Sequence, residues 1–214
     1  QELECNFNMS GETVFASEDL ETLLNMAQEP KYKTGFDRNL WIWKTKEEGK
    51  DYFITADVAR GDGKDYSTAL VFCTETMEQV AEYKGKCTPD IFSKILYDIG
   101  VEYGNALLVV ENNSVGFAVL DKLRESKYPN LYYSIKSTHE FVEEYQAENM
   151  NNAVAGFSMT SKTRPLIVAK MEEFIRNNLI KLYSSRILSE MKTFVWNNGR
   201  AEAMRSYNDD LIMA

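Results

Sequence analysis

The chain has 214 residues, 44% of them hydrophobic and 27% charged, a globular composition that excludes a disordered tail, a collagen-like chain and a disulfide-stapled miniprotein. At about 150 residues per domain, this length indicates one domain with an attached arm, and no run approaches the roughly 18 apolar residues that span a bilayer. The net charge of −9 at first argues against a nucleic-acid partner, but residues 1–150 carry −12 and residues 151–214 carry +3.

The first fifty residues predict little regular structure. Residues 1–16 alternate loosely between apolar and polar side chains and indicate an extended arm with a turn at Ser10-Gly11. A short helix is expected over residues 18–28, stopped by Pro30, and residues 41–43 (WIW) are typical of a strand.

A sharper pattern follows. Three strands are predicted at residues 52–57, 68–73 and 77–83, with the second and third joined by a tight turn. Pro89 opens a helix whose apolar residues have helical spacing. Residues 106–110 (ALLVV) form a continuous apolar run, which is typical of a strand buried on both faces.

The remaining elements complete an α/β pattern. We expect a helix over 115–124, a strand at 131–135, a helix over 163–177, a short strand at 179–183, a helix from Ser184 or Ser185 to about 194, a hairpin turning at 197–199, and a last helix from about Tyr207. The order β-β-β-α-β-α-β-α predicts a mixed central sheet, three antiparallel strands and then parallel ones, flanked by helices. This is the element order of the ribonuclease H-like fold, here with a C-terminal β-hairpin insertion.

Cysteine and histidine offer little chemistry. The three cysteines, Cys5, Cys73 and Cys87, show no CxxC spacing, and His139 is the only histidine. A structural zinc site would need all four to converge from distant segments, so we interpret the cysteines as reduced thiols of an intracellular protein. A Ser-His-Asp or Cys-His mechanism would depend entirely on His139 and is disfavoured.

Acidic residues stand out where apolar runs end. Asp57 ends one strand, Glu111 follows another, and Asp209 and Asp210 lie where the last helix begins. Carboxylates at strand ends meet at the rim where open α/β sheets bind ligands. Such a cluster is a hard oxygen site suited to Mg²⁺ or Mn²⁺. Two such metals about 3.5–4 Å apart can support phosphodiester hydrolysis.

Each acid also has an ordinary structural explanation. Asp57 could start the turn before Gly61, Glu111 could neighbour a helix cap, and an acidic pair at a helix N-terminus is favoured by the helix dipole. Their joint occurrence favours the metal site. The loop GDGKD lacks both the P-loop and the EF-hand register, so its acids, Asp62 and Asp65, are either outer ligands or, more simply, solvated turn residues.

Three segments resemble a known family. ADVARGDGKDYSTALV, VVENNSVGFAVLDKL and SYNDDLIMA resemble, in order, the acidic motifs of the nuclease domain of large terminase subunits, most closely those of T-even-like tailed bacteriophages. The opening QELECNF resembles the segment that follows the ATPase domain there, and the resemblance covers essentially the whole chain. It implies an endonuclease that cuts concatemeric double-stranded viral DNA at initiation and termination of genome packaging, with Mg²⁺ as cofactor and Mn²⁺ as a substitute.

The resemblance also implies roles for individual residues. Asp57 and Glu111 match the first two acids, and the final pair matches Asp209 and Asp210. We expect Asp210 to complete the catalytic, metal-binding triad, with Asp209 as an auxiliary ligand. Many relatives carry His before this pair, whereas this chain has Asn208, which puts a histidine base in doubt.

The same likeness implies a context. Because the chain starts without Met and stops at LIMA in mid-pattern, we expect a fragment. Residues 1–50 would be an arm and linker that follows the absent ATPase domain and packs on the nuclease domain, residues 51–214. The implied partners are double-stranded DNA, the ATPase domain of the same polypeptide, and the phage portal and small terminase subunit. The implied location is the host cytoplasm, away from any membrane.

The basic C-terminal third supplies candidate DNA contacts. They are Lys162, Arg164, Arg186, Lys192, Arg200 and Arg205, although ordinary surface charge explains part of this set equally well. Residues 194–204 form the predicted hairpin, which could gate or grip the duplex. Trp41, Trp43 and Trp196 are expected to pack in the core or at its rim.

Three alternatives remain open. An ATP-binding domain of the sugar-kinase and actin type should carry a second phosphate-binding Asp-Gly hairpin, and none follows residue 111. A resolvase-type nuclease of the same fold is usually more basic. A docking module with structural acids predicts that Asp57→Ala leaves metal response and DNA processing unchanged.

Overall fold

The computed structural model describes residues 12–136, 141–142, 144–147 and 151–214. Its centre is a six-stranded sheet of order β1-β2-β5-β4-β3-β6. The strands are β1 (Tyr32–Thr34), β2 (Leu40–Ile42), β3 (Tyr52–Asp57), β4 (Ser67–Cys73), β5 (Glu78–Gly85) and β6 (Leu107–Val110). As predicted, β3, β4 and β5 are antiparallel neighbours, and β6 runs parallel to β3.

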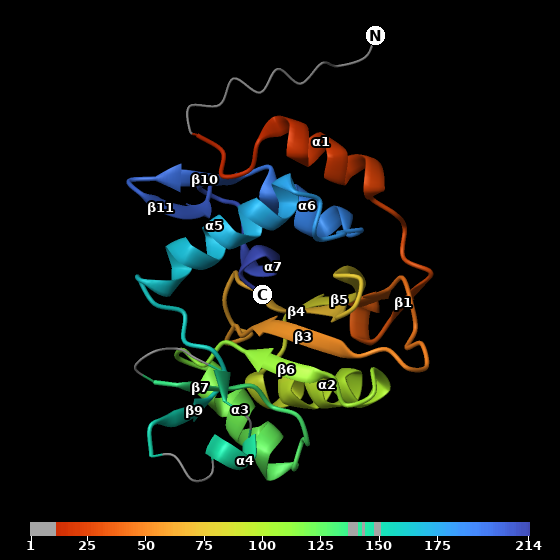
Figure 1. Cartoon of the computed structure of the whole chain (residues 1–214), viewed down its shortest axis with the longest axis vertical. Helices are drawn as coiled ribbons and strands as arrows, with labels where there is room; N and C mark the ends of the chain where they lie inside the picture. Colours follow the sequence, from red (N-terminus) through yellow and green to blue (C-terminus); the bar gives the residue numbers. More distant parts are fainter. Residues whose placement is uncertain (1–11, 137–140, 143, 148–150) are drawn as a thin grey trace.

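Helices cover both faces of this sheet. α2 (Pro89–Glu102) and α3 (Gly116–Glu125) lie on one side, below the sheet in Figure 1. On the other side lie α1 (Ser17–Met26), α5 (Thr163–Arg176), α6 (Ser185–Met191) and α7 (Asp210–Met213). Each helix layer needs an apolar partner, and the two faces of the sheet provide one each.

The central strand β4 shows how one sequence serves both layers. Successive side chains of a strand point to opposite faces. Ala69 and Val71 join the core cluster that contains Phe92 and Leu96 of α2. Leu70 and Phe72 join a second cluster with residues of α6 and α7. Since both faces are covered, the whole strand is buried, and residues 69–73 (ALVFC) are an unbroken apolar run.

The predicted hairpin is present as β10 (Phe194–Asn197) and β11 (Arg200–Ala203). Its two turn residues, Asn198 and Gly199, both have positive φ, of 50° and 78°. That conformation is typical of a two-residue hairpin turn and favours the Asn-Gly pair found there. The hairpin packs beside α5 in Figure 1.

Residues 12–50 contribute to the same body. β2 pairs with β5 at the edge of the central sheet, and β1 pairs with β2. In α1, Leu20 and Leu23 are buried in the cluster shared with α6 and α7. The predicted helix over 18–28 is therefore present, two residues shorter at its end, and the strand at 41–43 is shifted by one residue.

The parallel strand predicted at 131–135 pairs with β6 over a single residue only. Only Leu131 bridges β6 in parallel, through Leu108. Farther along β6, the carbonyl of Val110 accepts the N–H of Phe157 at 2.9 Å, so a different segment takes this edge. The chain instead turns away into a small antiparallel sheet of β7 (Tyr133–Ile135), β8 (Phe141–Val142) and β9 (Ala153–Ala155), with α4 (Glu144–Ala147) beside it.

Three smaller predictions need adjustment. The strand expected at 179–183 is a single parallel bridge between Lys181 and Glu78. The helix capped by Ser184 ends at Met191 rather than near 194, because β10 begins there, and the last helix begins at Asp210 rather than near Tyr207.

Some predictions lie outside the described residues. These concern Cys5, His139 and residues 1–11 of the extended arm, with its turn at Ser10-Gly11. In the described part of the arm, Thr13 bridges Val195 and Phe15 is buried. Cys73 and Cys87 are free thiols. Within the described parts, the helices are all too short or too polar to cross a bilayer.

Candidate active site

Asp57 and Glu111 meet because their strands are parallel neighbours. Asp57 is the last residue of β3, and Glu111 directly follows β6, its N–H donating to the Ala56 carbonyl at 3.0 Å. The two carboxyl groups lie close enough for Glu111 to affect the ionisation of Asp57. Two carboxylates this close repel each other, so ionising Asp57 is unfavourable without a cation.

Burial and the neighbouring acids disfavour ionisation of Asp57. Burial, the hydrogen bond to Glu111 and repulsion from Glu111 and Asp210 together raise the pKa of Asp57 from an ordinary 3.8 to about 8. Like charges that share a site cannot all ionise without a cation. The protonated form of Asp57 is therefore favoured near neutral pH when metal is absent.

Asp210 reaches the same region from the other helix layer. It is the first residue of α7, it is 7% exposed, and α7 packs on β3 and β4. Its Oδ2 accepts the side-chain amide of Asn208 at 2.8 Å and the N–H of Tyr66 at 3.2 Å. Its carbonyl accepts the hydroxyl of Thr68 at 2.8 Å. Burial raises its pKa, although the two hydrogen bonds to the carboxylate oppose that effect.

Asp209 points elsewhere. Its Oδ2 accepts Nη2 of Arg164 at 3.0 Å, and the same nitrogen donates to the Ala201 carbonyl at 3.0 Å. Arg164 thus connects α5, the hairpin and the acidic pair. Of the four predicted acids, the structure brings Asp57, Glu111 and Asp210 into electrostatic contact and directs Asp209 towards α5.

In the described part of the chain, no three Asp, Glu, His or Cys side chains are already arranged to hold a metal ion. Asp57 and Glu111 act on each other directly, while the Asp210 carboxylate accepts hydrogen bonds from Asn208 and Tyr66. The three side chains are nevertheless all hard carboxylate oxygen donors, whose mutual repulsion a divalent cation would relieve. In donor chemistry, the residues present therefore fit Mg²⁺ or Mn²⁺.

Sequence reasoning missed the residues that hold these acids. The side-chain amide of Asn113 donates to Oε1 of Glu111 at 2.7 Å and to the Met159 carbonyl at 2.6 Å. Only the polar run ENN after a buried strand hinted at this role. Gly116 is a second such residue, because a Cβ there would lie 1.8 Å from the Glu111 carbonyl oxygen, so α3 can begin this close only with glycine.

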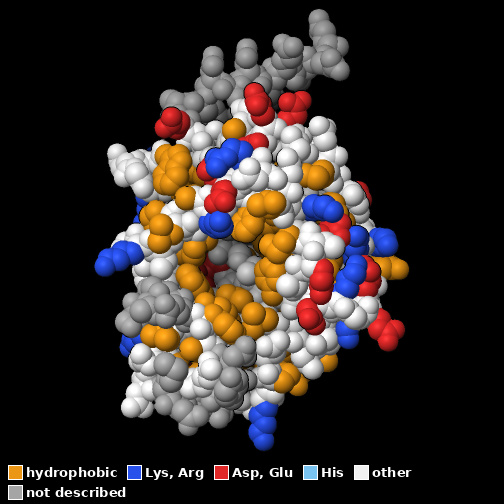
Figure 2. Space-filling view, in the orientation of Figure 1, with side chains coloured by type: hydrophobic (Ala, Val, Ile, Leu, Met, Phe, Trp, Pro, Cys, Tyr) orange, Lys and Arg blue, Asp and Glu red, His pale blue; other side chains and the backbone are white. Residues whose placement is uncertain are grey.

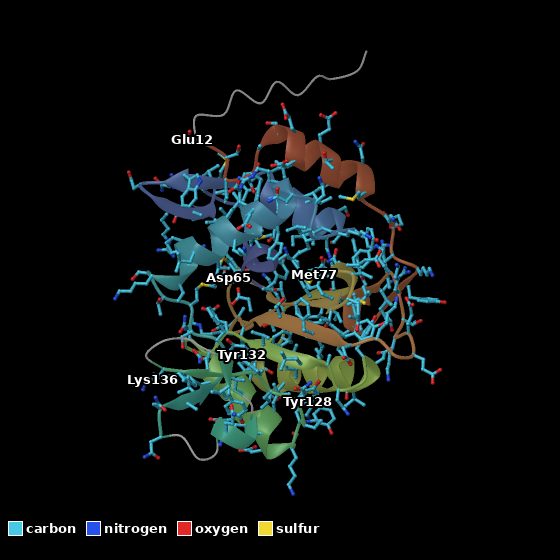
Figure 3. The ribbon with its side chains drawn as sticks, viewed as in Figure 1. Glu12, Asp65, Met77, Tyr128, Tyr132 and Lys136 are labelled. Carbon is cyan, nitrogen blue, oxygen red and sulfur yellow. The ribbon has the colours of Figure 1, made fainter. Side chains whose placement is uncertain are left out.

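The glycine loop between β3 and β4 comes close to the site at one end. Asp62 is exposed and lies 3.6 Å from Arg60, as a solvated turn residue would. Asp65, labelled in Figure 3, lies in the loop near α7, and its charge helps to raise the pKa of Asp210. Gly61 has a φ of 86°, and a Cβ there would meet the Cys87 carbonyl oxygen at 2.4 Å, so this turn requires glycine.

A cavity of about 390 Å³ opens beside Glu111. It lies between the end of β6, α5 and the hairpin, and it is lined by Glu111, Asn113, Thr160, Arg164, Trp196 and Arg200, among others. Figure 2 shows the face drawn in Figure 1 hollowed near its centre, with acidic surface inside the hollow and apolar side chains around it. Two of the six predicted DNA contacts, Arg164 and Arg200, line the cavity.

The other predicted cations are not among the residues that line it. Arg186 donates to Glu82 at 2.6 Å and stacks 3.8 Å from the ring centre of Trp41. It lines a second groove, which Asn208 also borders. Lys162 and Arg205 are exposed, and Lys192 is half-buried at the end of α6.

The tryptophans divide in the same way. Trp43 is buried, and Trp41 packs edge-on against it at 6.2 Å. Trp196, by contrast, lines the cavity beside Glu111. Packing explains the first two, while the third has a face towards the candidate site.

Comparison with known proteins identifies the architecture. No protein-family model and no curated protein sequence matches this chain. Its fold is similar to that of the large terminase nuclease from thermophilic phage G20c with bound magnesium (16% identity, TM-score 0.69, covering 96% of this chain and 94% of that one). It is also similar to the large terminase nuclease domain of Thermus phage P74-26 (17%, TM-score 0.68, 94% and 91%) and to the human cytomegalovirus terminase nuclease domain, manganese-soaked with inhibitor bound (11%, TM-score 0.51, 94% and 91%). The mixed sheet between two helix layers is therefore the predicted ribonuclease H-like fold.

Proposed function

We propose that this domain is the metal-dependent endonuclease of a phage large terminase, cutting concatemeric double-stranded DNA at initiation and termination of genome packaging. The observation that carries the proposal is that Glu111 and Asp210 both lie close enough to Asp57 to disfavour its ionisation. The shared fold with terminase nuclease domains supports it, as do the three acidic motifs of the sequence.

The metal ligands would be Asp57, Glu111 and Asp210, with Asp209 as an auxiliary ligand that Arg164 now holds. Magnesium, cobalt and manganese each occur with terminase nucleases of this fold, which supports a divalent cation. Our finer proposal is that Mg²⁺ is the main cofactor and Mn²⁺ substitutes for it. Bound at these acids, such a cation would lower the pKa of water and neutralise charge on the departing oxygen.

The chain's own residues prepare the site. Because burial and the neighbouring acids favour the protonated form of Asp57, its carboxyl would have to ionise in order to hold a cation. Asn113 fixes the orientation of Glu111, and Asn208 with the Tyr66 N–H fixes that of Asp210. These hydrogen bonds restrict the orientation of two of the three carboxylates before substrate binds.

DNA would reach these acids through the cavity beside Glu111. Arg164 and Arg200 line it and can contact phosphates next to the cut, while the hairpin closes one side. Lys162, Arg186, Lys192 and Arg205 would extend this contact along the C-terminal third. Such contacts are independent of base sequence and weaken with salt.

The proposed context follows from the terminase resemblance. Residues 1–50 would connect residues 51–214 to the ATPase domain of the same polypeptide. The portal and the small terminase subunit would be partners in the intact motor, in the host cytoplasm.

A plasmid-cutting assay tests the proposal. Supercoiled plasmid is incubated with Mg²⁺, Mn²⁺, Ca²⁺ or EDTA, using the wild type, Asp57→Asn and the control Asp62→Asn. Asp62 is matched to Asp57 in charge and lies in the loop that follows β3, but it is exposed. Nicking and linearisation with Mg²⁺ or Mn²⁺ that only Asp57→Asn abolishes is the expected result. A folded wild type that cuts with none of these metals would instead favour a docking module.

A further inference from the structure

Glu190, near the end of α6, is a buried carboxylate that connects three elements. Its side chain is 7% exposed. One oxygen is paired with Lys84 of β5. The other, Oε2, accepts the N–H groups of Leu211 at 2.8 Å and Ile212 at 3.3 Å. Sheet, α6 and α7 therefore meet at this one side chain.

Those two N–H groups immediately follow Asp210. The first N–H groups of a helix have no partner within it, and a carboxylate that accepts them fixes the helix start. α7 has only four residues, too few to be stable alone. The residue before it, Asp209, is paired with Arg164, so the carboxylate that holds the start of α7 comes from Glu190.

Lys84 makes this arrangement possible. A buried carboxylate without a partner is costly, and the Lys84 ammonium, itself 16% exposed, offsets its charge. Lys84 also lies 4.9 Å from the ring centre of Tyr66, whose N–H donates to the Asp210 carboxylate. The pair thus supports Asp210 in two ways. Glu190 binds the backbone of α7, and Lys84 packs on Tyr66, the residue before β4.

We infer that Glu190, neutralised by Lys84, is the positioning residue for Asp210. It holds the start of α7 so that the Asp210 carboxylate faces Asp57 and Glu111 when a divalent cation binds. Both oxygens of Glu190 are engaged by Lys84 and α7, so Glu190 acts through Asp210 rather than as a ligand. The inference rests on the proposed function.

Two variants separate positioning from simple stability. Glu190→Gln keeps an oxygen for the α7 N–H groups but loses the ion pair, and Glu190→Asp keeps the charge but shortens the reach. Glu125→Gln is the control, because Glu125 forms an exposed Lys–Glu pair at 2.7 Å on α3, away from the site. The first readout needs no DNA: the rise in melting temperature on Mn²⁺ titration, which reports metal affinity. The second is the split between KM for DNA and kcat.

Loss of a group that orients a metal ligand typically weakens metal binding 10- to 100-fold. For both Glu190 variants we expect the Mn²⁺ midpoint to rise about tenfold or more and kcat to fall, with KM for DNA changed less than twofold. In an Asp210→Asn background, Glu190→Gln should add less than about twofold to the midpoint, since both act through the same carboxylate.

Three outcomes would overturn the inference. One is a lower melting temperature with an unchanged Mn²⁺ midpoint and kcat, which marks a structural residue only. Another is an undiminished effect in the Asp210→Asn background. If the single variants do not fold, the double variant Glu190→Gln/Lys84→Met removes both charges together. An unchanged Mn²⁺ midpoint in that double variant is the third outcome that would overturn the inference. A wild type that neither binds Mn²⁺ nor cuts DNA would contradict the proposed function instead.

Discussion

Metal binding and the surroundings of Asp57 favour opposite ionisation states of its carboxyl group. To serve as a metal ligand it must be ionised, yet beside Glu111 and Asp210 its ionisation is unfavourable without a cation. Without a cation, the site should therefore be less stable with all its carboxylates ionised than with Asp57 protonated. That conflict is typical of functional sites, where local stability is lost for activity.

This conflict predicts how stability depends on pH in EDTA. The pKa of Asp57 is about 8 in the folded chain and near 3.8 when unfolded, so the folded state binds more protons between these values. The free energy of unfolding should fall as pH rises from about 5 to 8.5, and each pKa unit is worth about 1.4 kcal/mol. Discounting for relaxation around the buried pair, we expect a loss of about 3 kcal/mol, measured by urea unfolding.

The control for this prediction is Asp57→Asn. It should remove most of the slope and melt higher than the wild type at pH 8 in EDTA. Burial raises the pKa of Glu190 to about 7 despite Lys84, so a smaller slope of the same sign should remain. A wild-type stability that is flat or rises over this range would contradict the protonated pair.

At the scale of elements, the site depends on strand order and on the elements that close over it. The parallel pairing of β3 with β6 brings two acids together, and α7 supplies the third. The hairpin and α5 then form the wall of the cavity through Arg164 and Arg200. A substitution in the hairpin should therefore weaken DNA binding without disturbing the three carboxylates.

Arg200→Ala tests that separation. Arg200 is exposed at the cavity and lies 3.8 Å from Glu202, a weak surface pair, so the substitution should change stability by less than about 0.5 kcal/mol. Loss of one phosphate contact should weaken binding of duplex DNA and reduce the slope of log affinity against log salt by about one. Fluorescence anisotropy with Ca²⁺ across salt concentrations measures both.

Lys170→Ala is the matched control, since Lys170 carries the same charge on the exposed side of α5 and pairs with Glu173 at 2.9 Å. It should leave the salt slope unchanged. Equal losses in the two variants would mean that general surface charge, and not the cavity, attracts DNA.

Over the whole molecule, the sequence predicted what local patterns encode. Apolar runs ending in Asp57 and Glu111 mark buried strands, and Asn198-Gly199 marks the hairpin turn. The strand predicted at 131–135 exists only as β7 in another sheet, because Phe157 takes part of the edge of β6. That competition is between segments distant in the sequence, and no local pattern reveals it. For the same reason Glu190 was missed: its role exists only where α6 meets α7.

A crystal of the domain soaked in Mn²⁺ would test the central claim most directly, namely that Asp57, Glu111 and Asp210 form one metal site. The anomalous difference map should place manganese in contact with Asp57 and with at least one of the other two carboxylates, at the roughly 2.0–2.2 Å expected of carboxylate ligands. Manganese bound only elsewhere, away from these three carboxylates, would contradict the account.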